Sequence, residues 1–277
     1  MTDDAIGGLL ADPRFELLPF MGFEDELEKL PPGAKVAITA SPEKGLELTI
    51  DQSVATAERG FEVIPHVAAR AVEDGDHLVS IADRLEAAGI EDVFVPGGDN
   101  EEPAGPYDSS LSLLEDLDER GYDFPDVGIT GYPEGHPIID DETLVDALQA
   151  KEPYATYIVT QLCFDPDAII RWIEDVRSLG VDLPVYVGIP GVMRTERMLS
   201  ISRKVGVGQS IRFVRKTTGI LGMVRQLLGG KGRYTPDALV EGLAPYHGQA
   251  RYDLAGIHLY TFNQVADSER WRQGRLG

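Results

Sequence analysis

Residues 156–191 read TYIVTQLCFDPDAIIRWIEDVRSLGVDLPVYVGIPG and contain the unit that decides the fold. Two apolar, β-branched runs, Thr156–Gln161 and Pro184–Ile189, flank an amphipathic stretch, Pro166–Leu179, which ends at Gly180. The two runs are continuously apolar, which is typical of strands that a parallel sheet buries on both faces. The amphipathic stretch predicts a helix with a glycine cap. The segment therefore predicts a strand–helix–strand unit.

This unit recurs about every thirty residues along the chain. Helical stretches at His77–Ala88 and Ser109–Arg120 also end at glycines, Gly89 and Gly121. Eight units fit a closed barrel better than an open doubly wound sheet, which usually has fewer strands. The predicted strands are Phe15–Phe20, Lys35–Ala40, Glu62–Val67, Asp92–Pro96, Asp126–Thr130, Thr156–Gln161, Pro184–Ile189 and Gly256–Phe262.

The predicted fold is a (β/α)₈ TIM barrel, formed as a single domain by residues 1–277. A longer, mostly helical region, Thr195–Ala244, separates the seventh and eighth strands. A length of 277 residues is normal for one α/β barrel, and 43% hydrophobic residues suffice for a large core. No shift in composition marks a second domain.

Composition also limits location and partners. No apolar run is long enough to cross a bilayer, and the amino terminus lacks the features of a signal peptide, so we expect a cytoplasmic protein without membrane contact. The lone Cys163 excludes an internal disulfide and a multi-cysteine metal site.

The net charge of −22 is the unusual feature of the composition. Such a surface repels nucleic acid, so we expect no nucleic-acid partner. The acidic residues are scattered rather than gathered in a tail, and arginine far outnumbers lysine. These features favour the hypothesis of a halophilic protein, because high salt screens the repulsion between like charges.

Polar residues follow most of the predicted strands, where a barrel of this kind carries its active site. Each alone has a structural explanation: Asp99 as a helix N-cap, His66 as a hydrogen-bonded wall residue, and Gln161 as a partner for backbone groups. Their convergence on one mouth favours a functional site. The residues are Glu16, Thr39, His66, Asp99, Tyr132 with Glu134 and His136, Gln161 and Asn263.

Glycines directly follow three strands, in PGGDN, TGYPEGHP and GIPG. Tight turns explain part of this pattern, and close approach of a planar cofactor to the backbone explains it equally well. No phosphate-loop motif is present. The sequence shows no third ligand beside His66 and His136, so we expect no metal site.

At residues 131–137 the sequence GYPEGHP resembles the YPExHP loop of the methylenetetrahydrofolate reductases. Further matches keep the family's order over nearly the whole chain. They are Phe15-Glu16, Pro65-His66, Gly98-Asp99, Thr160-Gln161 with Phe164-Asp165, Gly188-Ile189-Pro190-Gly191 and Tyr260-Thr261-Phe262-Asn263.

The resemblance implies a barrel that binds FAD at its strand ends and passes hydride from reduced flavin to a folate-bound methylene group. Glu16 would be the general acid that opens the folate's imidazolidine ring, and its pKa should be raised by a partly apolar site. Asp99 would tune the flavin and bind the pterin, and Gln161 would bind the pterin or nicotinamide amide. Thr39, His66, Gly97, Gly98, Tyr132, His136 and Lys151 would line the flavin and its phosphates.

The chain departs from the family's pattern at two cations. Gly97 stands where the family has an arginine that contacts phosphate, and Gln264 stands where an arginine can hold the folate tail. Gln264 is kept as a substrate-binding candidate. The positive charge could come from the region after the seventh strand, where the candidates are Arg194, Arg197, Arg212 and Arg215.

The leading hypothesis is therefore a flavin-dependent methylenetetrahydrofolate reductase of methionine synthesis. NADH, NADPH or an electron-donor protein would supply the electrons, and the family leads us to expect a homo-oligomer. The loss of the arginine at Gly97 motivates an alternative, a flavin-free folate-dependent methyltransferase or demethylase. A non-catalytic paralogue is a third reading, which the retained Glu16 and Asp99 disfavour.

Overall fold

Eight parallel strands form the centre of the molecule, in the spatial order β3-β2-β1-β10-β7-β6-β5-β4. The computed structural model describes residues 2–20, 22–194 and 233–277. All eight predicted strands are present, with ends that differ by a few residues. Their bounds are β1 Arg14–Leu17, β2 Lys35–Ile38, β3 Glu62–Pro65, β4 Asp92–Phe94, β5 Asp126–Gly131, β6 Tyr157–Thr160, β7 Val185–Pro190 and β10 Leu254–Tyr260.

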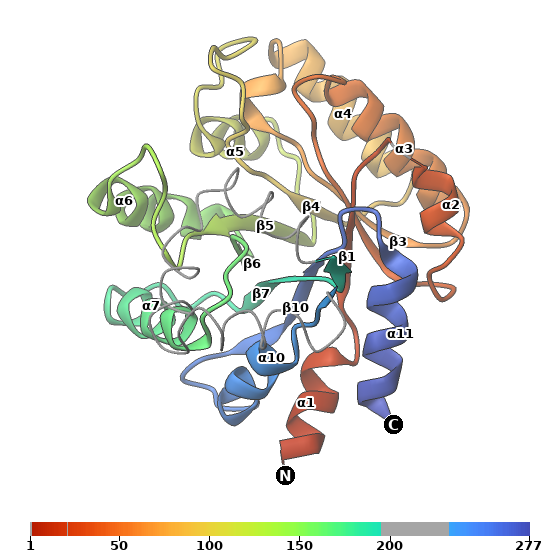
Figure 1. Cartoon of the computed structure of the whole chain (residues 1–277). Helices are drawn as coiled ribbons and strands as arrows, with labels where there is room; N and C mark the ends of the chain where they lie inside the picture. The colour runs from red at the N-terminus through yellow and green to blue at the C-terminus, as the bar shows by residue number, and fades with distance from the viewer. Residues whose placement is uncertain (1, 21, 195–232) are drawn as a thin grey trace.

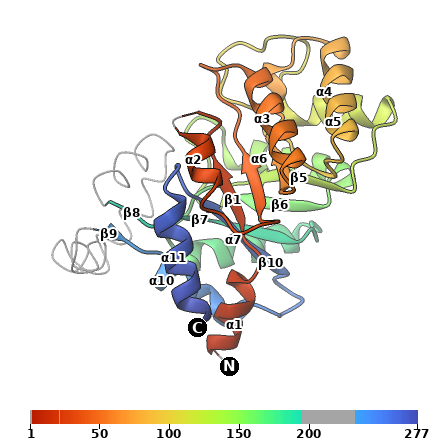
Figure 2. The same ribbon diagram turned by 90° about the vertical axis from the view of Figure 1, so that its right-hand side faces the viewer.

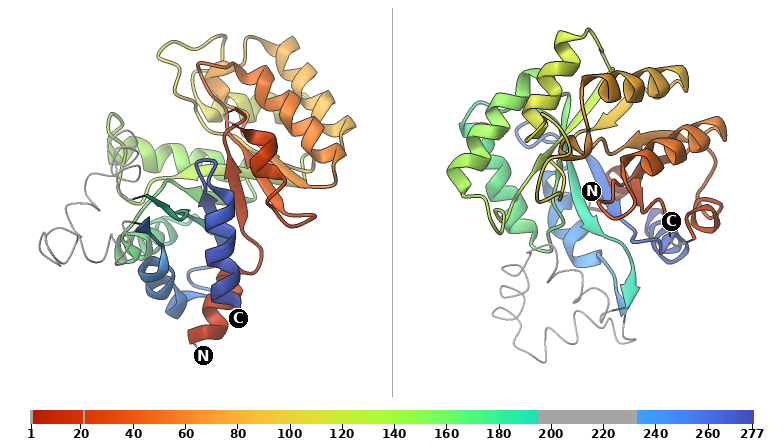
Figure 3. Two further views of the ribbon diagram at one scale, coloured as in Figure 1. Left: turned by 45° about the vertical axis from the view of Figure 1, so that its right-hand side comes forward. Right: turned by 90° about the horizontal axis from the view of Figure 1, so that it is seen from above.

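The two outer strands of this order meet and bring the sheet almost to closure. Beyond the end of β3, His66 forms a parallel bridge with Phe94 at the end of β4. The amide nitrogen of Val67 donates to the carbonyl oxygen of Phe94 at 2.8 Å. The helices lie around the outside of the strands in the view from above (Figure 3). The predicted (β/α)₈ barrel is confirmed.

Helices follow most of the strands and cover the outside of the barrel (Figure 1). The terminal helices α1 and α11 pack against each other at one side (Figures 1 and 2). No helix in the described ranges is long and apolar enough to cross a membrane. The bounds are α1 Thr2–Leu10, α2 Phe23–Leu27, α3 Leu46–Glu58, α4 Gly75–Ala87, α5 Ser110–Glu119, α6 Asp141–Lys151, α7 Pro166–Ser178, α10 Asp237–Leu243 and α11 Val265–Leu276.

Helix α7 shows why these segments become helices. The Asp165 side chain accepts a hydrogen bond from the amide of Asp167, and Pro166 occupies the first helical position. The buried side chains recur at helical spacing and face the barrel. Gly180 follows the helix with a positive φ of 87°, as the sequence predicted. Gly89 and Gly121 end α4 and α5 in the same way.

Between β7 and β10 the structure is only partly described. The short strands β8 (Met193–Arg194) and β9 (Arg233–Tyr234) pair antiparallel, and α10 follows them. The predicted helical region of residues 195–244 is thus seen only from residue 233 onward. Arg197, Arg212 and Arg215 lie outside the described residues.

Alternation along β1 separates the outer core from the barrel interior. Phe15 and Leu17 are buried in the large hydrophobic core. Arg14 and Glu16 point the other way, into the barrel. Arg14 contacts Tyr157 on β6 and Asp92 on β4. Glu16 contacts His258 on the neighbouring strand β10. The inner face of β1 therefore carries one cation and one acid, on consecutive inward positions.

Arg14 fills the amino-terminal end of the barrel and is 3% exposed. Its guanidinium lies 3.8 Å from the ring centres of both Tyr157 and Tyr186, and its Nη2 atom is 3.0 Å from a carboxylate oxygen of Asp92. The Tyr157 hydroxyl donates to the other oxygen of Asp92 at 2.6 Å. The aromatic faces and the carboxylate together stabilise the buried charge.

Candidate functional site

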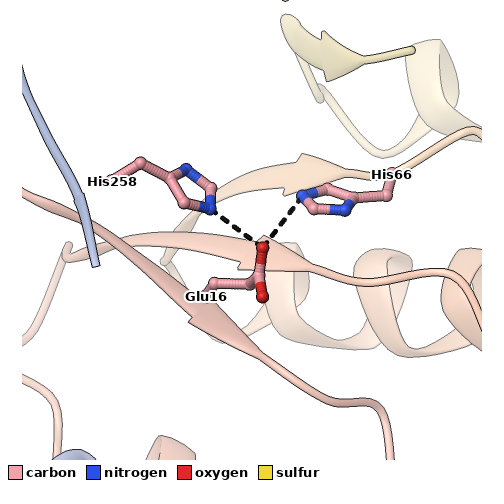
Figure 4. Close-up of side chains that lie close together, drawn as sticks. All are labelled: Glu16, His66 and His258. Carbon is pink, nitrogen blue, oxygen red and sulfur yellow. Dashed lines mark hydrogen bonds and ion pairs between the residues drawn. The ribbon is translucent and has the colours of Figure 1, made fainter. Parts of the chain in front are cut away.

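Glu16 occupies the centre of the barrel at the carboxyl-terminal half of β1 and is 8% exposed. Its Oε2 atom lies 3.0 Å from Nε2 of His258 on β10 and 3.9 Å from Nε2 of His66, which follows β3. Both imidazole rings point toward the same carboxylate oxygen (Figure 4). The barrel thus brings together an acid and two histidines that are far apart in sequence.

Burial sets the protonation states of this cluster. It raises the pKa of Glu16 to about 7, against a smaller opposing effect of His66. Burial lowers the pKa of His66 to about 4 and that of His258 to about 3. Near neutral pH both imidazoles are neutral and Glu16 holds its proton part of the time. Glu16 can therefore release a proton at pH 7 and recover it, as a general acid must.

His258 was not among the residues selected from the sequence. Its position on the strand carried a signal, because it lies two residues before Tyr260 and therefore on the same face of β10. Its partner could not be read from the sequence, since 242 residues separate it from Glu16. Only the pairing of β1 with β10 places them together.

Residues 261–263, directly after β10, hold the loop that follows Glu16 through hydrogen bonds. The hydroxyl of Thr261 donates to the carbonyl oxygen of Glu16 at 2.5 Å. The Asn263 side chain accepts from the amide of Leu18 at 2.8 Å and donates to the carbonyl oxygens of Leu18 and Phe20 at 3.1 and 2.7 Å. Asn263 has a positive φ of 54°. It serves to hold the backbone rather than to extend toward a ligand.

The loop after β4 carries Gly97, Gly98 and Asp99. A Cβ atom added at Gly97 would meet nothing within 4 Å, so the side of the loop where the family has an arginine is open. At Gly98, φ is +96° and an added Cβ would lie 3.2 Å from that of Ala68. The glycine is required there by conformation and by packing. Asp99 is exposed.

Tyr132 and His136 lie beside each other in the loop after β5, with ring centres 5.2 Å apart. Burial raises the pKa of Tyr132 and lowers that of His136. The negative charge of Asp99 acts on both groups and raises both pKa values. The structure thus brings Asp99 near this pair, as expected for residues of one mouth.

Four candidate residues have polar side-chain atoms with no hydrogen-bond partner or with only a local one. The Thr39 hydroxyl and the Gln264 amide nitrogen are buried and find no hydrogen-bond partner in the described part of the chain. The Nε2 atom of His66 is likewise buried and has no hydrogen-bond partner among the described residues. Gln161 is half-buried, and its side-chain oxygen accepts from the amide of Leu162 at 2.7 Å. Buried polar groups are usually satisfied, so the orphaned atoms favour a polar ligand at the mouth.

Lys151 is not brought to this mouth. It is the last residue of α6, and the helix starts beyond the carboxyl end of β5 and runs back toward the other end of the barrel. Eleven helical residues span roughly 15 Å. The Lys151 side chain is buried, and burial lowers its pKa to about 8. The phosphate contact expected from the sequence is therefore not supported by this position.

The ligand atoms of Glu16, His66 and His258 all lie within 4.8 Å of one another. They are the donor types that zinc uses in two-histidine, one-carboxylate sites. From the sequence we expect no metal, because a third ligand beside His66 was not recognised. The cluster could hold a divalent ion, although Glu16 and His258 already satisfy each other.

A cavity of about 510 Å³ opens beside the mouth, between α6 and α7. Its lining includes Tyr132 and His136 as well as Leu144, Trp172 and Leu179. Its size is in the range of small-molecule sites. Tyr132 and His136, two of the residues predicted to line the cofactor, border this partly open space.

Fold and site together define a barrel protein with a buried, titratable acid and several unsatisfied polar atoms at the carboxyl ends of its strands. The family model described as methylenetetrahydrofolate reductase matches residues 28–268. The chain belongs to the methylenetetrahydrofolate reductase family. Glu16 lies before the matched residues, so its assignment depends on the geometry and on the matching motifs.

Individual relatives agree with the family. Methylenetetrahydrofolate reductase 2 of Saccharomyces cerevisiae is 27% identical over 172 residues, which cover 56% of this chain and 28% of the yeast protein. Methylenetetrahydrofolate reductase (NADH) 1 of Arabidopsis thaliana is 26% identical over 216 residues, with 69% and 34% covered. The probable methylenetetrahydrofolate reductase (NADPH) of Caenorhabditis elegans is 22% identical, with 65% and 29% covered. The matched part spans about a third of each relative.

Among solved structures, a chitinase from Rhizomucor miehei superposes with a TM-score of 0.51 at 12% identity. The match covers 95% of this chain and 99% of the chitinase. At this identity the likeness concerns the barrel fold alone.

Proposed function

We propose that this chain reduces the methylene group of 5,10-methylenetetrahydrofolate to the methyl group of 5-methyltetrahydrofolate. The observation that carries the proposal is Glu16, a buried acid with a pKa of about 7 at the centre of the mouth. Membership of the family supplies the substrate class. The single-domain organisation of residues 1–277 is part of the same proposal.

In this function Glu16 delivers a proton to the folate. Protonation of N10 breaks its bond to the methylene carbon and leaves an iminium at N5, which then accepts a hydride. The neutral imidazole of His258 contacts Oε2 of Glu16, and can stabilise the carboxylate left after proton transfer by donating an N–H to this oxygen. The carboxyl then recovers a proton from solvent before the next cycle.

FAD, when bound, would supply the hydride. The residues present fit a flavin in one respect, since the Thr39 hydroxyl is buried and has no hydrogen-bond partner in the described part of the chain. Gly97, Gly98, Tyr132 and His136 would complete its surroundings. Lys151 is left out because of its position at the end of α6. Asp99, Gln161 and Gln264 are proposed to bind the folate, with Asp99 also near the flavin.

The source of electrons belongs to the proposal as well. Relatives are named for NADH and for NADPH, and an electron-donor protein is the third possibility. A cytoplasmic location and a homo-oligomer stay predictions. The flavin-free methyltransferase or demethylase is not favoured, because the relatives named above are all called reductases.

Absorption spectroscopy of the purified protein tests the function directly. After incubation with FAD, we expect the protein to show the visible absorption bands of bound flavin. A chemical reductant should bleach these bands, and methylenetetrahydrofolate should restore them. Failure of the folate to reoxidise a bound flavin would contradict the proposal. Methyl transfer from the folate by a flavin-free protein would establish the alternative.

Adaptation to high salt is proposed from the net charge of −22. Screening of like charges should raise the melting temperature when salt is increased from 0.1 M to molar concentrations. A melting temperature that does not rise would contradict this proposal without affecting the one for catalysis.

A further inference from the structure

Arg70 lies in the turn directly after β3, within the short 3₁₀ helix Ala69–Ala71. Its backbone adjoins the loop that carries Asp99. The Arg70 amide donates to the carbonyl oxygen of Gly97 at 2.9 Å, and its carbonyl oxygen accepts from the amide of Ala104 at 2.9 Å. The backbone of one residue thus contacts both ends of the 97–104 stretch.

The guanidinium of Arg70 binds the same loop from within. Its Nε donates to the carbonyl oxygen of Asn100 at 2.8 Å, its Nη1 to that of Asp108 at 2.9 Å, and its Nη2 to that of Glu101 at 2.6 Å. The Asn100 side chain donates back to the carbonyl oxygen of Arg70 at 3.2 Å. One planar fork therefore fixes three points of a loop that has no helix or strand of its own.

Arg70 donates to backbone carbonyl oxygens, as Arg177 near the end of helix α7 also does. None of the described carboxylates lies within ion-pair distance of the Arg70 guanidinium, although Glu101, Glu102 and Asp108 belong to the same loop. Neutral carbonyl oxygens take its donors instead. Its contribution is therefore to the path of the backbone, which a lysine with one ammonium group could not reproduce.

Asp99 lies between the fixed points. Gly98 before it is held by a positive φ and by its contact with Ala68, and Asn100 after it is held by Arg70. Asp99 is exposed, and its own side chain makes no hydrogen bond or ion pair to any residue in the described ranges. The backbone path of the loop thus sets the position from which the Asp99 side chain extends.

We propose that Arg70 is a positioning residue that holds the 97–108 loop and thereby the carboxylate of Asp99 at the mouth. The part concerning Asp99 rests on the proposed function, in which Asp99 binds the folate. The clamp, by which we mean the hydrogen bonds from Arg70 to the 97–108 loop, does not depend on the proposed function.

Hydrogen–deuterium exchange of the ligand-free protein tests the clamp. Arg70→Met removes the fork, and Arg70→Lys keeps the charge but not the fork. Arg84→Met is the matched control, because Arg84 binds carboxylates of Glu47 and Asp51 on the outer helix α3. We expect both Arg70 variants to exchange faster at residues 97–108, and the control to match the wild type there. Unchanged exchange in both Arg70 variants would overturn the clamp.

Folate binding tests the effect on Asp99. We expect Arg70→Met and Arg70→Lys each to raise the dissociation constant about tenfold, the size of one lost charge-assisted contact. In an Asp99→Asn background, Arg70→Met should add little. An equal additional loss in that background would show that Arg70 acts elsewhere and would overturn the positioning role. Faster loop exchange together with full folate affinity in Asp99→Asn would contradict the proposed function instead.

Discussion

The two ends of the barrel interior differ in how their buried charges are satisfied. At the amino-terminal end, Arg14 is enclosed by two tyrosine rings and paired with Asp92. At the carboxyl-terminal end, Glu16 has a single close partner, His258, and a second histidine 3.9 Å away. The two residues lie on the same face of one strand, two positions apart.

The difference shows how one strand serves stability and chemistry. Burial also raises the pKa of Asp92, to about 6, but Arg14 and Tyr157 oppose the rise and bind its carboxylate. Glu16 has no cation beside it, so the effect of burial prevails. Burial raises the pKa of both carboxyl groups, but the cation beside Asp92 keeps its pKa below 7, whereas Glu16, which has only neutral imidazoles beside it, holds its proton part of the time near neutral pH.

The largest effect is expected from Glu16→Gln. The amide keeps the shape but cannot deliver a proton, so folate reduction should fall about 100-fold or more. Reduction of bound flavin by its electron donor should change little, since that half-reaction does not need the acid. Stopped-flow measurement of the two half-reactions separates them. Folate reduction that is retained in this variant would show that Glu16 is not the proton donor.

The second-largest effect is expected on stability, from a substitution at the amino-terminal end of the barrel interior. Arg14→Met leaves the half-buried Asp92 without its cation, and breaking a buried pair costs about 3 kcal/mol of unfolding free energy. Urea denaturation measures the loss. The control is Arg251→Met, whose exposed pair with Glu174 should contribute less than about 1 kcal/mol. Equal losses in the two variants would show that the enclosed arginine has no special structural role.

The pH dependence of folate reduction should follow Glu16. Its pKa is raised from 4.5 to about 7, so the acid is protonated below that value and ionised above it. The rate should be level under pH 6 and fall about tenfold per unit well above pH 7. The contribution of Glu16 to the free energy of unfolding also falls as pH rises, because between pH 4.5 and 7 the folded state retains a proton that the unfolded state releases.

Comparison with Glu16→Gln isolates the contribution of Glu16 from that of the histidines. His66 and His258, with lowered pKa values, oppose the trend in stability because the unfolded state binds protons that the folded state does not. Relative to wild type, the variant should gain stability as pH rises from 4.5 to 7. A difference that is independent of pH would indicate an ordinary pKa for Glu16.

The smallest effect is expected at Asn263, which supports Glu16 through the backbone. Asn263→Gly keeps the left-handed conformation but loses the three hydrogen bonds to Leu18 and Phe20. Folate reduction should fall several-fold, by roughly the contribution of one or two hydrogen bonds. Asn263→Ala adds backbone strain and should be less stable than the glycine variant. Full activity in Asn263→Gly would show that the loop after β1 needs no such support.

Much of the fold could be predicted because it depends on local patterns. Continuous apolar runs marked all eight strands, and glycines at residues 89, 121 and 180 marked three helix ends. Strand ends were less certain. Phe20, for example, was predicted as strand, but β1 ends at Leu17, where the backbone turns to meet Asn263. A contact across 243 residues leaves no local signal.

The site was predictable only in part, for the same reason. Glu16, His66, Asp99, Tyr132 and His136 each follow or end a strand, and the barrel brings them to one mouth. The family resemblance also implied Lys151, but the direction of α6 carries this residue toward the opposite end of the barrel.

The sequence by itself determined the class of fold, the family and the chemical groups available, because strand and helix periodicity and short motifs are written in consecutive residues. Only the tertiary structure decided that His258 contacts Glu16, that Arg14 is enclosed at the other end, and that Arg70 fastens the Asp99 loop. Each depends on strands that the fold brings together from distant parts of the chain, and burial in the barrel interior then raises the pKa of Glu16.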